Sequence, residues 1–276
     1  MTLRKYKSLK RGALITGLWV LTLTQLIPIW LMVIGSLKSA KEAALPSIAL
    51  PTEWHFENYI TVFQKGKIAQ ALYNSIFISG SAVIVAILLA SAAAFYLARI
   101  QTKWSKLIYN TISLGLIAPV SIIPTIRLMQ VFHINNTYLS VILLFSAIYM
   151  PLCVFLITGF IKKIPRDLDE ASIIDGCSPL LLFIKIILPL LKPVLLTGAV
   201  ISFMGIWNSF VIPLYFLNNS SKWTLPLTVY NFFGQYSRDW NLVFADLVIT
   251  ASPVAIFYLI AQKYIISGLT AGAVKG

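Results

Sequence analysis

Glu170-Ala171-Ser172-Ile173-Ile174-Asp175-Gly176 is a short polar stretch in a chain that is otherwise very apolar. Asp167, three residues upstream, is a candidate cap for a short helix whose first turn carries Asp169 and Glu170. Acidic residues are favourable at that end of a helix. Gly176 can end the helix in a left-handed conformation. The pattern predicts a short acidic helix that stops at the glycine.

A second short helix is predicted directly downstream. Ser178 is a good helix cap, and Pro179 is well tolerated at the first helical position. Pro189 and Pro193 mark the exit from this helix into the next apolar segment. Two short helices joined by a sharp turn would form a rigid projection that suits docking into a groove of a soluble partner.

The composition around this projection indicates a membrane protein. The chain has 276 residues, of which 58% are hydrophobic and 11% charged, and its mean hydropathy is +0.84. Soluble proteins carry about 25% charged residues, and a helix needs about 20 mainly apolar residues to cross a bilayer. The sequence predicts an all-α protein with a single transmembrane domain over residues 1–276. The expected crossings are 13–37, 70–98, 107–131, 138–160, 193–217 and 244–266.

The distribution of basic residues predicts the orientation of the chain. Most of the 22 Lys and Arg residues fall in segments that lie on the same side of the membrane as the amino terminus. This is the pattern of cytosolic segments, so both termini and the loop 161–192 are expected in the cytosol and the segment 38–69 outside. The net charge of +13 therefore orients the protein in the lipid bilayer, and it does not indicate a nucleic-acid partner.

Local patterns add detail to this plan. Residues 57–69 alternate apolar and polar side chains and predict an amphipathic helix on the outer surface. The second crossing is rich in small residues between Ser79 and Ala94, which favours a central position in a helix bundle. Prolines interrupt the third, fifth and sixth crossings, which fits either a moving pathway or the ordinary frequency of proline in membrane helices.

The sequence lacks the residues that covalent chemistry would need. His55 and His133 have no metal-ligand spacing around them, and Cys153 and Cys177 are expected in different compartments. No GxxxxGK[ST] phosphate-binding loop is present. The chain is therefore expected to have no catalytic residues, no metal and no bound cofactor of its own.

The polar stretch carries a resemblance to a known family. Glu-Ala-Ser, three residues, Gly, nine residues, Ile, one residue and Leu-Pro, over residues 170–189, resemble the EAA signature of binding-protein-dependent ABC importer permeases. Ser172 stands where alanine is usual. Residues 268–276 resemble the carboxyl-terminal signature of the carbohydrate branch, and more narrowly the G-type permease subunit of maltose-like sugar importers. Asn58-Tyr59 and Trp207-Asn208 are weaker matches.

The resemblance implies a fold, a set of partners and a role for the polar stretch. The fold is the type I ABC importer permease fold, with six transmembrane helices in the cytoplasmic membrane of a prokaryote. The partners are a homologous F-type permease subunit, two cytosolic ATPase subunits that bind ATP and Mg, and an extracytoplasmic sugar-binding protein. The polar stretch would be the helix that couples the permease to the ATPase, through Glu170, Ala171, Ser172, Asp175 and Gly176.

Five further residues are candidates for the translocation pathway. Sugars are held by flat aromatic faces and by polar groups that match their hydroxyls, so Trp207, Asn208 and Ser209 in the fifth crossing are candidates, with helix packing as the alternative. Arg127 and Asp246 are charges in the third and sixth crossings. They would pair with one another, line an external vestibule or reach the headgroup region.

Two other classes of protein and other cargoes are open alternatives. The predicted function is ATP-driven import of a di- or oligosaccharide, with a polyol or glycerol-phosphate cargo as the alternative. An ion-coupled secondary transporter would show internal repeats and several acids near the midplane, and neither is evident in the sequence. A membrane-embedded enzyme would need a catalytic constellation within a crossing, and none is evident either.

Overall fold

The computed structural model describes residues 2–233 and 239–273, and these residues form helices and loops without a β-strand. The prediction of an all-α protein is confirmed. The last three residues of the carboxyl-terminal signature, 274–276, lie outside the described residues. The chain divides into two compact units, residues 1–68 with 228–252 and residues 69–227 with 253–276, which are described separately below.

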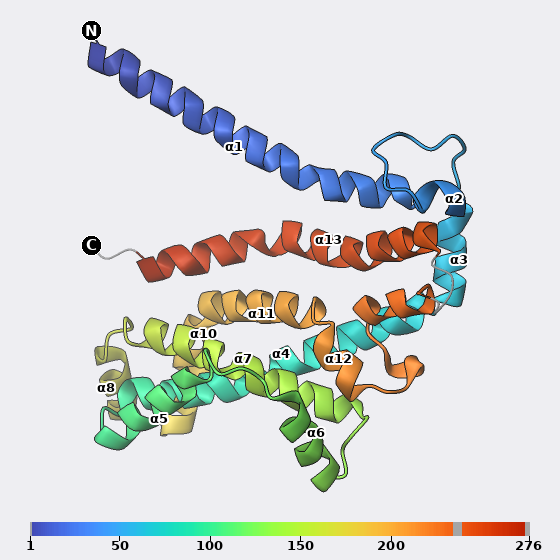
Figure 1. Cartoon of the computed structure of the whole chain (residues 1–276). Coiled ribbons are helices and arrows are strands. Elements are labelled where there is room, and N and C mark those ends of the chain that lie inside the picture. The colour runs from blue at the N-terminus through green and yellow to red at the C-terminus, as the bar shows by residue number, and fades with distance from the viewer. Residues whose placement is uncertain (1, 234–238, 274–276) are drawn as a thin grey trace. The chain divides into compact units, whose positions relative to one another are not determined.

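The first unit contains three helices and the beginning of a fourth (Figure 1). The long helix α1 leads into a loop and two short helices, and α13 starts here before it continues into the second unit. Their bounds are α1 Thr2–Gly35, α2 Ala40–Ala43, α3 Glu57–Lys65 and α13 Trp240–Ala273. The expected amphipathic helix over 57–69 is therefore shorter than predicted, because the backbone turns left-handed at Lys67, with φ of 51°.

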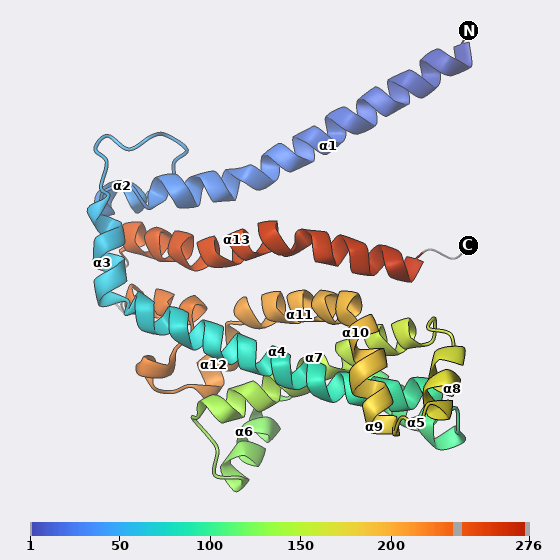
Figure 2. The same cartoon turned by 180° about the vertical axis from the view of Figure 1, so that it is seen from behind.

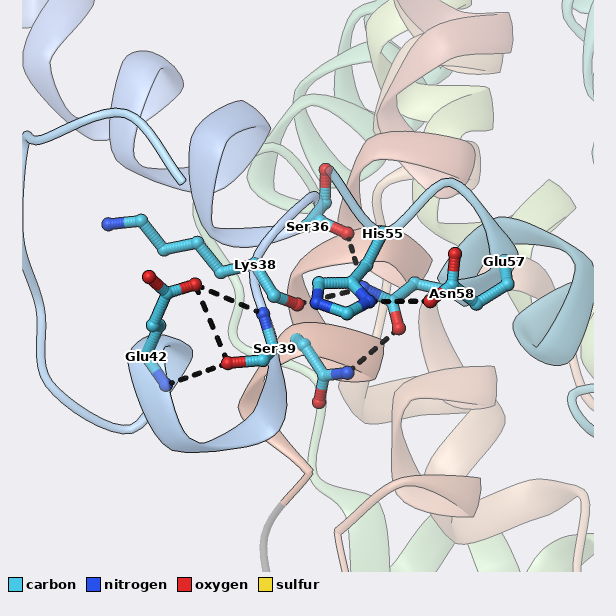
Figure 3. Close-up of polar contacts among 8 residues, drawn as sticks. Ser36, Lys38, Ser39, Glu42, His55, Glu57 and Asn58 are labelled. Carbon is cyan, nitrogen blue, oxygen red and sulfur yellow. Dashed lines mark hydrogen bonds and ion pairs between the residues drawn. The ribbon is translucent and has the colours of Figure 1, made fainter. Parts of the chain in front are cut away.

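Side-chain amides fasten the turn between α1 and α3 (Figure 3). The Nδ2 of Asn58 donates to the carbonyl oxygens of Ser36 and Lys38, at 2.9 and 3.0 Å. Its Oδ1 accepts a bond of 2.8 Å from the amide of Asn241 on α13. Asn58 is buried, so these bonds replace the water that its amide would otherwise bind. One asparagine thus joins the end of α1, the start of α3 and the start of α13.

The second unit contains the remaining helices (Figure 2). In both views α5 and α8 lie at one end of this unit, and α6 and α12 lie at the other. The α-helices are α4 Ile68–Arg99, α5 Lys103–Leu114, α6 Ile122–Val131, α7 Tyr138–Ile161, α8 Asp167–Ile174, α9 Pro179–Leu182, α10 Leu188–Leu190, α11 Lys192–Trp207 and α12 Val211–Phe216. Shorter turns are the π-helical η1 Phe183–Ile187 and the 3₁₀ turns η2 Ser220–Lys222 and η3 Leu225–Asn231, of which η3 continues into the first unit.

One face of α4 is buried, as its small residues favour. Alanines recur on it every four residues, which places them on one face of the helix. This face is fully or almost fully buried: Ala82, Ala86, Ala90, Ala94 and Ala98. Because alanine lets backbones approach closely, the hydroxyl of Ser146 on α7 reaches the carbonyl of Ala82 at 3.1 Å. Two apolar clusters extend from this face and contain residues of α7, α11 and α12.

The expected six crossings do not all appear as continuous helices. Among the described residues four helices are long and apolar enough to cross a membrane, and a fifth span is obtained if the bent pair Pro179–Leu190 and Lys192–Trp207 is counted as one. The third crossing, expected over 107–131, is not one continuous helix, because α5 ends at Leu114 and α6 begins at Ile122. The fifth, 193–217, is interrupted between Trp207 and Val211.

Two local causes explain the interruption of the third crossing. Pro119 has no N–H to continue a helix and disfavours helical geometry in the residue before it. Gly115 ends α5 where the chain packs closely on α7, and a Cβ at this position would lie 2.8 Å from the Cγ of Pro151. The chain therefore turns at Gly115 and resumes helical structure only after Pro119.

Candidate functional site

The acidic helix α8 forms where the sequence predicts it, with a different first residue. Asp167 is the first residue inside the helix, and Arg166 occupies the cap position without a side-chain cap bond. The prediction that Asp167 caps the helix is therefore wrong. Asp167, Asp169 and Glu170 nevertheless all lie in the first turn, where carboxylates interact favourably with the free N–H groups of the backbone.

Gly176 ends α8 in the predicted left-handed conformation, with φ of 81°. The amide of Gly176 donates to the carbonyl of Ile173 at 3.0 Å, and the amide of Cys177 donates to that of Ser172 at 2.9 Å. This pair of bonds is the Schellman arrangement, which satisfies the last carbonyls of a helix. Ser178 then caps α9, with Pro179 at its start, as predicted. The sharp turn between α8 and α9 follows from these local contacts.

The predicted coupling residues do not all lie on the same face of α8. Glu170, Ala171, Asp175 and Gly176 are exposed, whereas Ser172 is buried and its hydroxyl donates to the carbonyl of Leu168 at 2.6 Å. Ser172 therefore faces the interior, which explains why a small residue is needed there. Ile173 and Ile174, which the sequence did not mark as site residues, are 60% and 85% exposed. Two exposed isoleucines next to exposed carboxylates make the tip of α8 a compact apolar and acidic surface.

An ion pair fastens α8 to the end of α4. The Nε of Arg99 lies 2.6 Å from Oδ2 of Asp169, and its Nη2 donates to Oδ1 at 3.0 Å. The Nη1 of Arg99 donates to the carbonyl oxygens of Ile161 and Ile164, at 3.4 and 3.2 Å. The two charged side chains are only 12% and 14% exposed. We call this group of contacts the Arg99 clamp.

A second arginine adds a hydrogen bond to the Arg99 clamp. Arg166, at the start of α8, donates from Nη2 to the backbone carbonyl of Arg99 at 3.2 Å. Planar guanidinium groups are suited to such forked contacts, and a lysine offers only a single point of charge. The Arg99 clamp thus joins the end of α4, the end of α7 and the first turn of α8. The sequence analysis did not predict it.

Below the projection the chain bends sharply into α11. The axis of Pro179–Leu190 and the axis of Lys192–Trp207 differ by 72°. Pro189 and Pro193 flank the bend, and Leu191 at its centre is completely buried. Prolines remove backbone donors from the helical ladder and so favour a break at this point. The projection therefore meets α11 through a defined corner.

The predicted pathway residues Trp207, Asn208 and Ser209 lie at the end of α11. Trp207 is buried, and its Nε1 has no hydrogen-bond partner within the described part of the chain. Its ring packs 5.6 Å from that of Phe203, which in turn lies 4.5 Å from the ring of Phe257. Asn208 is exposed, ends α11 and donates to the carbonyl of Met204 at 2.9 Å. Ser209 lies in the break between α11 and α12.

The two charges predicted in the crossings each contact another residue. Arg127 on α6 donates to the side-chain carbonyl of Gln130 at 3.0 Å. Asp246 on α13 is buried and accepts a bond of 2.7 Å from the hydroxyl of Thr228. Arg127 lies in the second unit and Asp246 in the first, so their pairing stays a prediction. Among the described residues, no three His, Cys, Asp or Glu side chains lie close enough to hold a metal ion.

Comparison with known proteins assigns the family. Residues 82–270 match the family described as the binding-protein-dependent transport system inner membrane component. The chain belongs to this family. It is a transport component of the inner membrane, and the match includes α8 and the Arg99 clamp.

Two curated relatives and one solved structure extend this result. The multiple sugar-binding transport system permease protein MsmG of Streptococcus mutans is 37% identical over 91% of this chain and 92% of its own length. The melibiose/raffinose/stachyose import permease protein MelC of Bacillus subtilis is 35% identical over 91% of each chain. The fold resembles a bacterial ABC transporter that imports alginate, with a TM-score of 0.81, 19% identity and coverage of 96% and 98%. The fold is therefore that of an ABC importer permease.

Proposed function

We propose that this chain is one permease subunit of an ATP-driven importer of di- or oligosaccharides. It pairs with a homologous F-type permease subunit in the cytoplasmic membrane. Two cytosolic ATPase subunits hold ATP and Mg and supply the energy, and an extracytoplasmic binding protein delivers the sugar. Both termini face the cytosol. The family and the sugar-transport names of MsmG and MelC support this proposal.

The observation that carries the coupling role is the geometry of α8. Its tip exposes Ile173 and Ile174 beside the carboxylates of Glu170 and Asp175. Protein interfaces place apolar groups at their centre and charged groups at the rim, and this surface has that arrangement. A cleft of the ATPase with a basic rim fits it. Gly176 and the turn that follows it hold the tip in place.

The Arg99 clamp gives a path for motion into the membrane helices. When the ATPase subunits close on ATP, the coupling helices move with them, and the crossings exchange between inward- and outward-open states. Asp169 on α8 is held by Arg99, which also contacts the carbonyls at the end of α7. A displacement of α8 is therefore transmitted to α4 and α7. The chain contributes no covalent chemistry to this cycle.

The sugar is expected to contact the end of α11. Asn208 exposes a side-chain amide that can exchange hydrogen bonds with hydroxyls, and Trp207 and Ser209 lie on either side of it. Arg127 and Asp246 are proposed to line the outer part of the pathway. Di- or oligosaccharides are the expected cargo because MelC is named for the import of melibiose, raffinose and stachyose and MsmG for the binding of multiple sugars, and polyols or glycerol phosphates are the alternative.

Reversing the exposed charges of α8 tests the coupling role. We expect Glu170→Lys combined with Asp175→Lys to reduce sugar uptake at least about tenfold and to abolish stimulation of the ATPase by sugar. The new lysines would face the basic rim of the ATPase cleft, and repulsion between like charges should weaken the docked interface by more than about 1.4 kcal/mol. Uptake and ATP hydrolysis are measured in vesicles that contain the whole complex. The substrate is the sugar, from a panel of di- to pentasaccharides, that stimulates the wild-type ATPase most strongly.

A matched control reverses two exposed acids outside α8, Glu53→Lys with Asp239→Lys. This control changes the net charge equally and should keep uptake near the wild-type level. Unimpaired uptake in the α8 variant would refute the coupling role. A wild-type complex that no member of the sugar panel stimulates, but that a polyol or glycerol phosphate does, would refute the proposed cargo.

A further inference from the structure

We infer that a cavity between α5 and the end of α7 binds the phosphate group of an anionic phospholipid. The cavity measures about 400 Å³, and its lining includes Gln101, Lys106, Tyr109, Asn110 and Lys162. All of these residues belong to the second unit of the chain. The cavity is separate from the exposed tip of α8 and from the end of α11.

Two lysines give the cavity its charge. Lys106 lies in the first turn of α5, and Lys162 is the residue that ends α7. The Nζ of Lys162 lies 5.3 Å from the centre of the Tyr109 ring, a cation–π contact that holds the ammonium group at the cavity wall. Neither lysine forms an ion pair within the described residues, and no acidic side chain lines the cavity. Two positive charges side by side are favourable when an anion lies between them.

Uncharged donors complete a site for several oxygen atoms. The side-chain amides of Gln101 and Asn110 are exposed and can each donate to an anion. Ser105 also lines the cavity, but its hydroxyl donates to the carbonyls of Ile100 and Thr102 and is therefore occupied. Two ammonium groups and two amides match a phosphodiester, which has two ester oxygens and two further oxygens that share one negative charge.

The surface beside the cavity favours a lipid as the source of the phosphate. The outward face of α5 exposes Trp104, Leu107 and Ile108 to 75%, 54% and 46%. An exposed tryptophan followed by aliphatic side chains is typical of a helix that lies at the boundary between headgroups and acyl chains. The lysines would then bind the phosphate while the acyl chains pack on this apolar face.

The position of the cavity in the membrane, at the inner leaflet, rests on the proposed function. Helix α5 lies at the same end of the second unit as α8 (Figures 1 and 2). If α8 docks on a cytosolic ATPase, this end lies at the inner leaflet, where lysine-rich surfaces attract anionic headgroups. A bound lipid would hold α5 against α7, next to the Arg99 clamp.

Lipid binding to the purified complex tests the inference. The complex is isolated in detergent through a tag on this chain and titrated with phosphatidylglycerol or phosphatidylcholine, and bound lipid is counted by native mass spectrometry. We expect phosphatidylglycerol to bind more tightly than phosphatidylcholine. Lys106→Gln combined with Lys162→Gln should lower the affinity for phosphatidylglycerol about 30-fold, because each lysine contributes about one factor of five to six at an anionic surface.

A matched variant removes the same charge without touching the cavity. Lys103→Gln combined with Lys163→Gln changes neighbouring lysines of the same two segments that do not line it, and should bind phosphatidylglycerol nearly as the wild type does. Equal weakening in both double variants would indicate diffuse attraction and overturn the inference, as would equal binding of the two lipids. Displacement of phosphatidylglycerol by millimolar inorganic phosphate, but not by chloride of equal ionic strength, would assign the cavity to a soluble phosphate and overturn the lipid assignment.

This titration reads binding without transport, so it is independent of the test of α8. Failure of lipid binding while Glu170→Lys with Asp175→Lys still reduces uptake would reject the lipid site and leave the coupling role in place. Selective lipid binding in a complex whose uptake survives the α8 reversal would support the site and reject the coupling role.

Discussion

The junction at the end of α4 and the junction at the end of α11 are stabilised in different ways. At the first, Arg99 makes an ion pair with Asp169 and hydrogen bonds to two carbonyls. At the second, Trp207 is held by aromatic packing, with its Nε1 unpartnered among the described groups, and Asn208 bonds only the preceding turn in the contacts observed. Charged, directional contacts resist displacement, whereas apolar packing tolerates rearrangement at lower cost. The first junction suits transmission of motion, and the second suits a change of shape.

Among the conservative substitutions at the two junctions, the largest expected effect comes from breaking the Arg99 clamp. Asp169→Asn leaves a nearly buried guanidinium without its counter-charge, and we expect it to destabilise the protein by about 3 kcal/mol and to lower uptake per ATP hydrolysed. Thermal unfolding of the complex and the ratio of uptake to hydrolysis measure the two effects.

Two further variants distinguish the effect of losing the ion pair from the effect of losing any carboxylate in this turn. Asp167→Asn removes an exposed carboxylate from the same helical turn and should change stability by less than about 0.5 kcal/mol. Arg99→Lys keeps the charge but loses the forked geometry, so it should lie between the wild type and Asp169→Asn. Equal effects of Asp167→Asn and Asp169→Asn would show that the ion pair of Arg99 with Asp169 does not stabilise the junction at the end of α4.

A smaller and opposite result is expected at the end of α11. Trp207→Phe keeps an aromatic ring near Phe203 and removes a buried N–H that has no partner in the described region, so stability should stay unchanged or rise by about 1 kcal/mol. If the indole contacts sugar, the KM for uptake should rise several-fold while the maximal rate is kept.

Trp207→Ala is the control for packing at the same position. It leaves a cavity beside Phe203 and should destabilise the protein by about 3–5 kcal/mol. A Trp207→Phe variant that loses stability with an unchanged KM would assign the residue to packing alone and remove it from the pathway.

The sequence predicts those parts of the two junctions that depend on local signals. Gly176 and the Ser178-Pro179 pair correctly mark the end of α8 and the start of α9, because a left-handed turn and a serine cap act within a few residues. The alanine face of α4 is likewise visible as a repeat of small residues. These signals, with the EAA spacing, are enough to predict the class of fold and the position of α8.

Features that depend on contacts between distant segments could not be predicted in this way. Arg99 and Asp169 lie 70 positions apart, and nothing in the sequence near either one indicates the other as partner. The end of α5 at Gly115 depends on its close approach to Pro151, and the burial of Trp207 depends on the stacking of Phe203 on Phe257. Pro119 is the local signal for the broken third crossing, and its effect was underestimated.

The smallest expected effect concerns Glu42, a partly exposed carboxylate that serves as a comparison for the nearly buried ion pair of the Arg99 clamp. Glu42, in the short helix α2, accepts bonds of 2.7 and 3.2 Å from the hydroxyl and the amide of Thr52. These donors hold the pKa of the Glu42 carboxyl below its usual value. Its contribution to stability is therefore complete above the unfolded pKa of about 4.3 and is lost as the pH falls through the lower folded value.

We therefore expect Glu42→Gln to be slightly less stable than the wild type near neutral pH and equally stable in strong acid. Thermal unfolding of the detergent-solubilised protein over a pH series gives the difference between the two. Glu53→Gln, an exposed acid in the loop between α2 and α3, is the control and should follow the wild type throughout. A loss at Glu42 as large as that of Asp169→Asn would contradict the comparison, since solvent screens an exposed carboxylate and leaves the nearly buried pair of the Arg99 clamp largely unscreened.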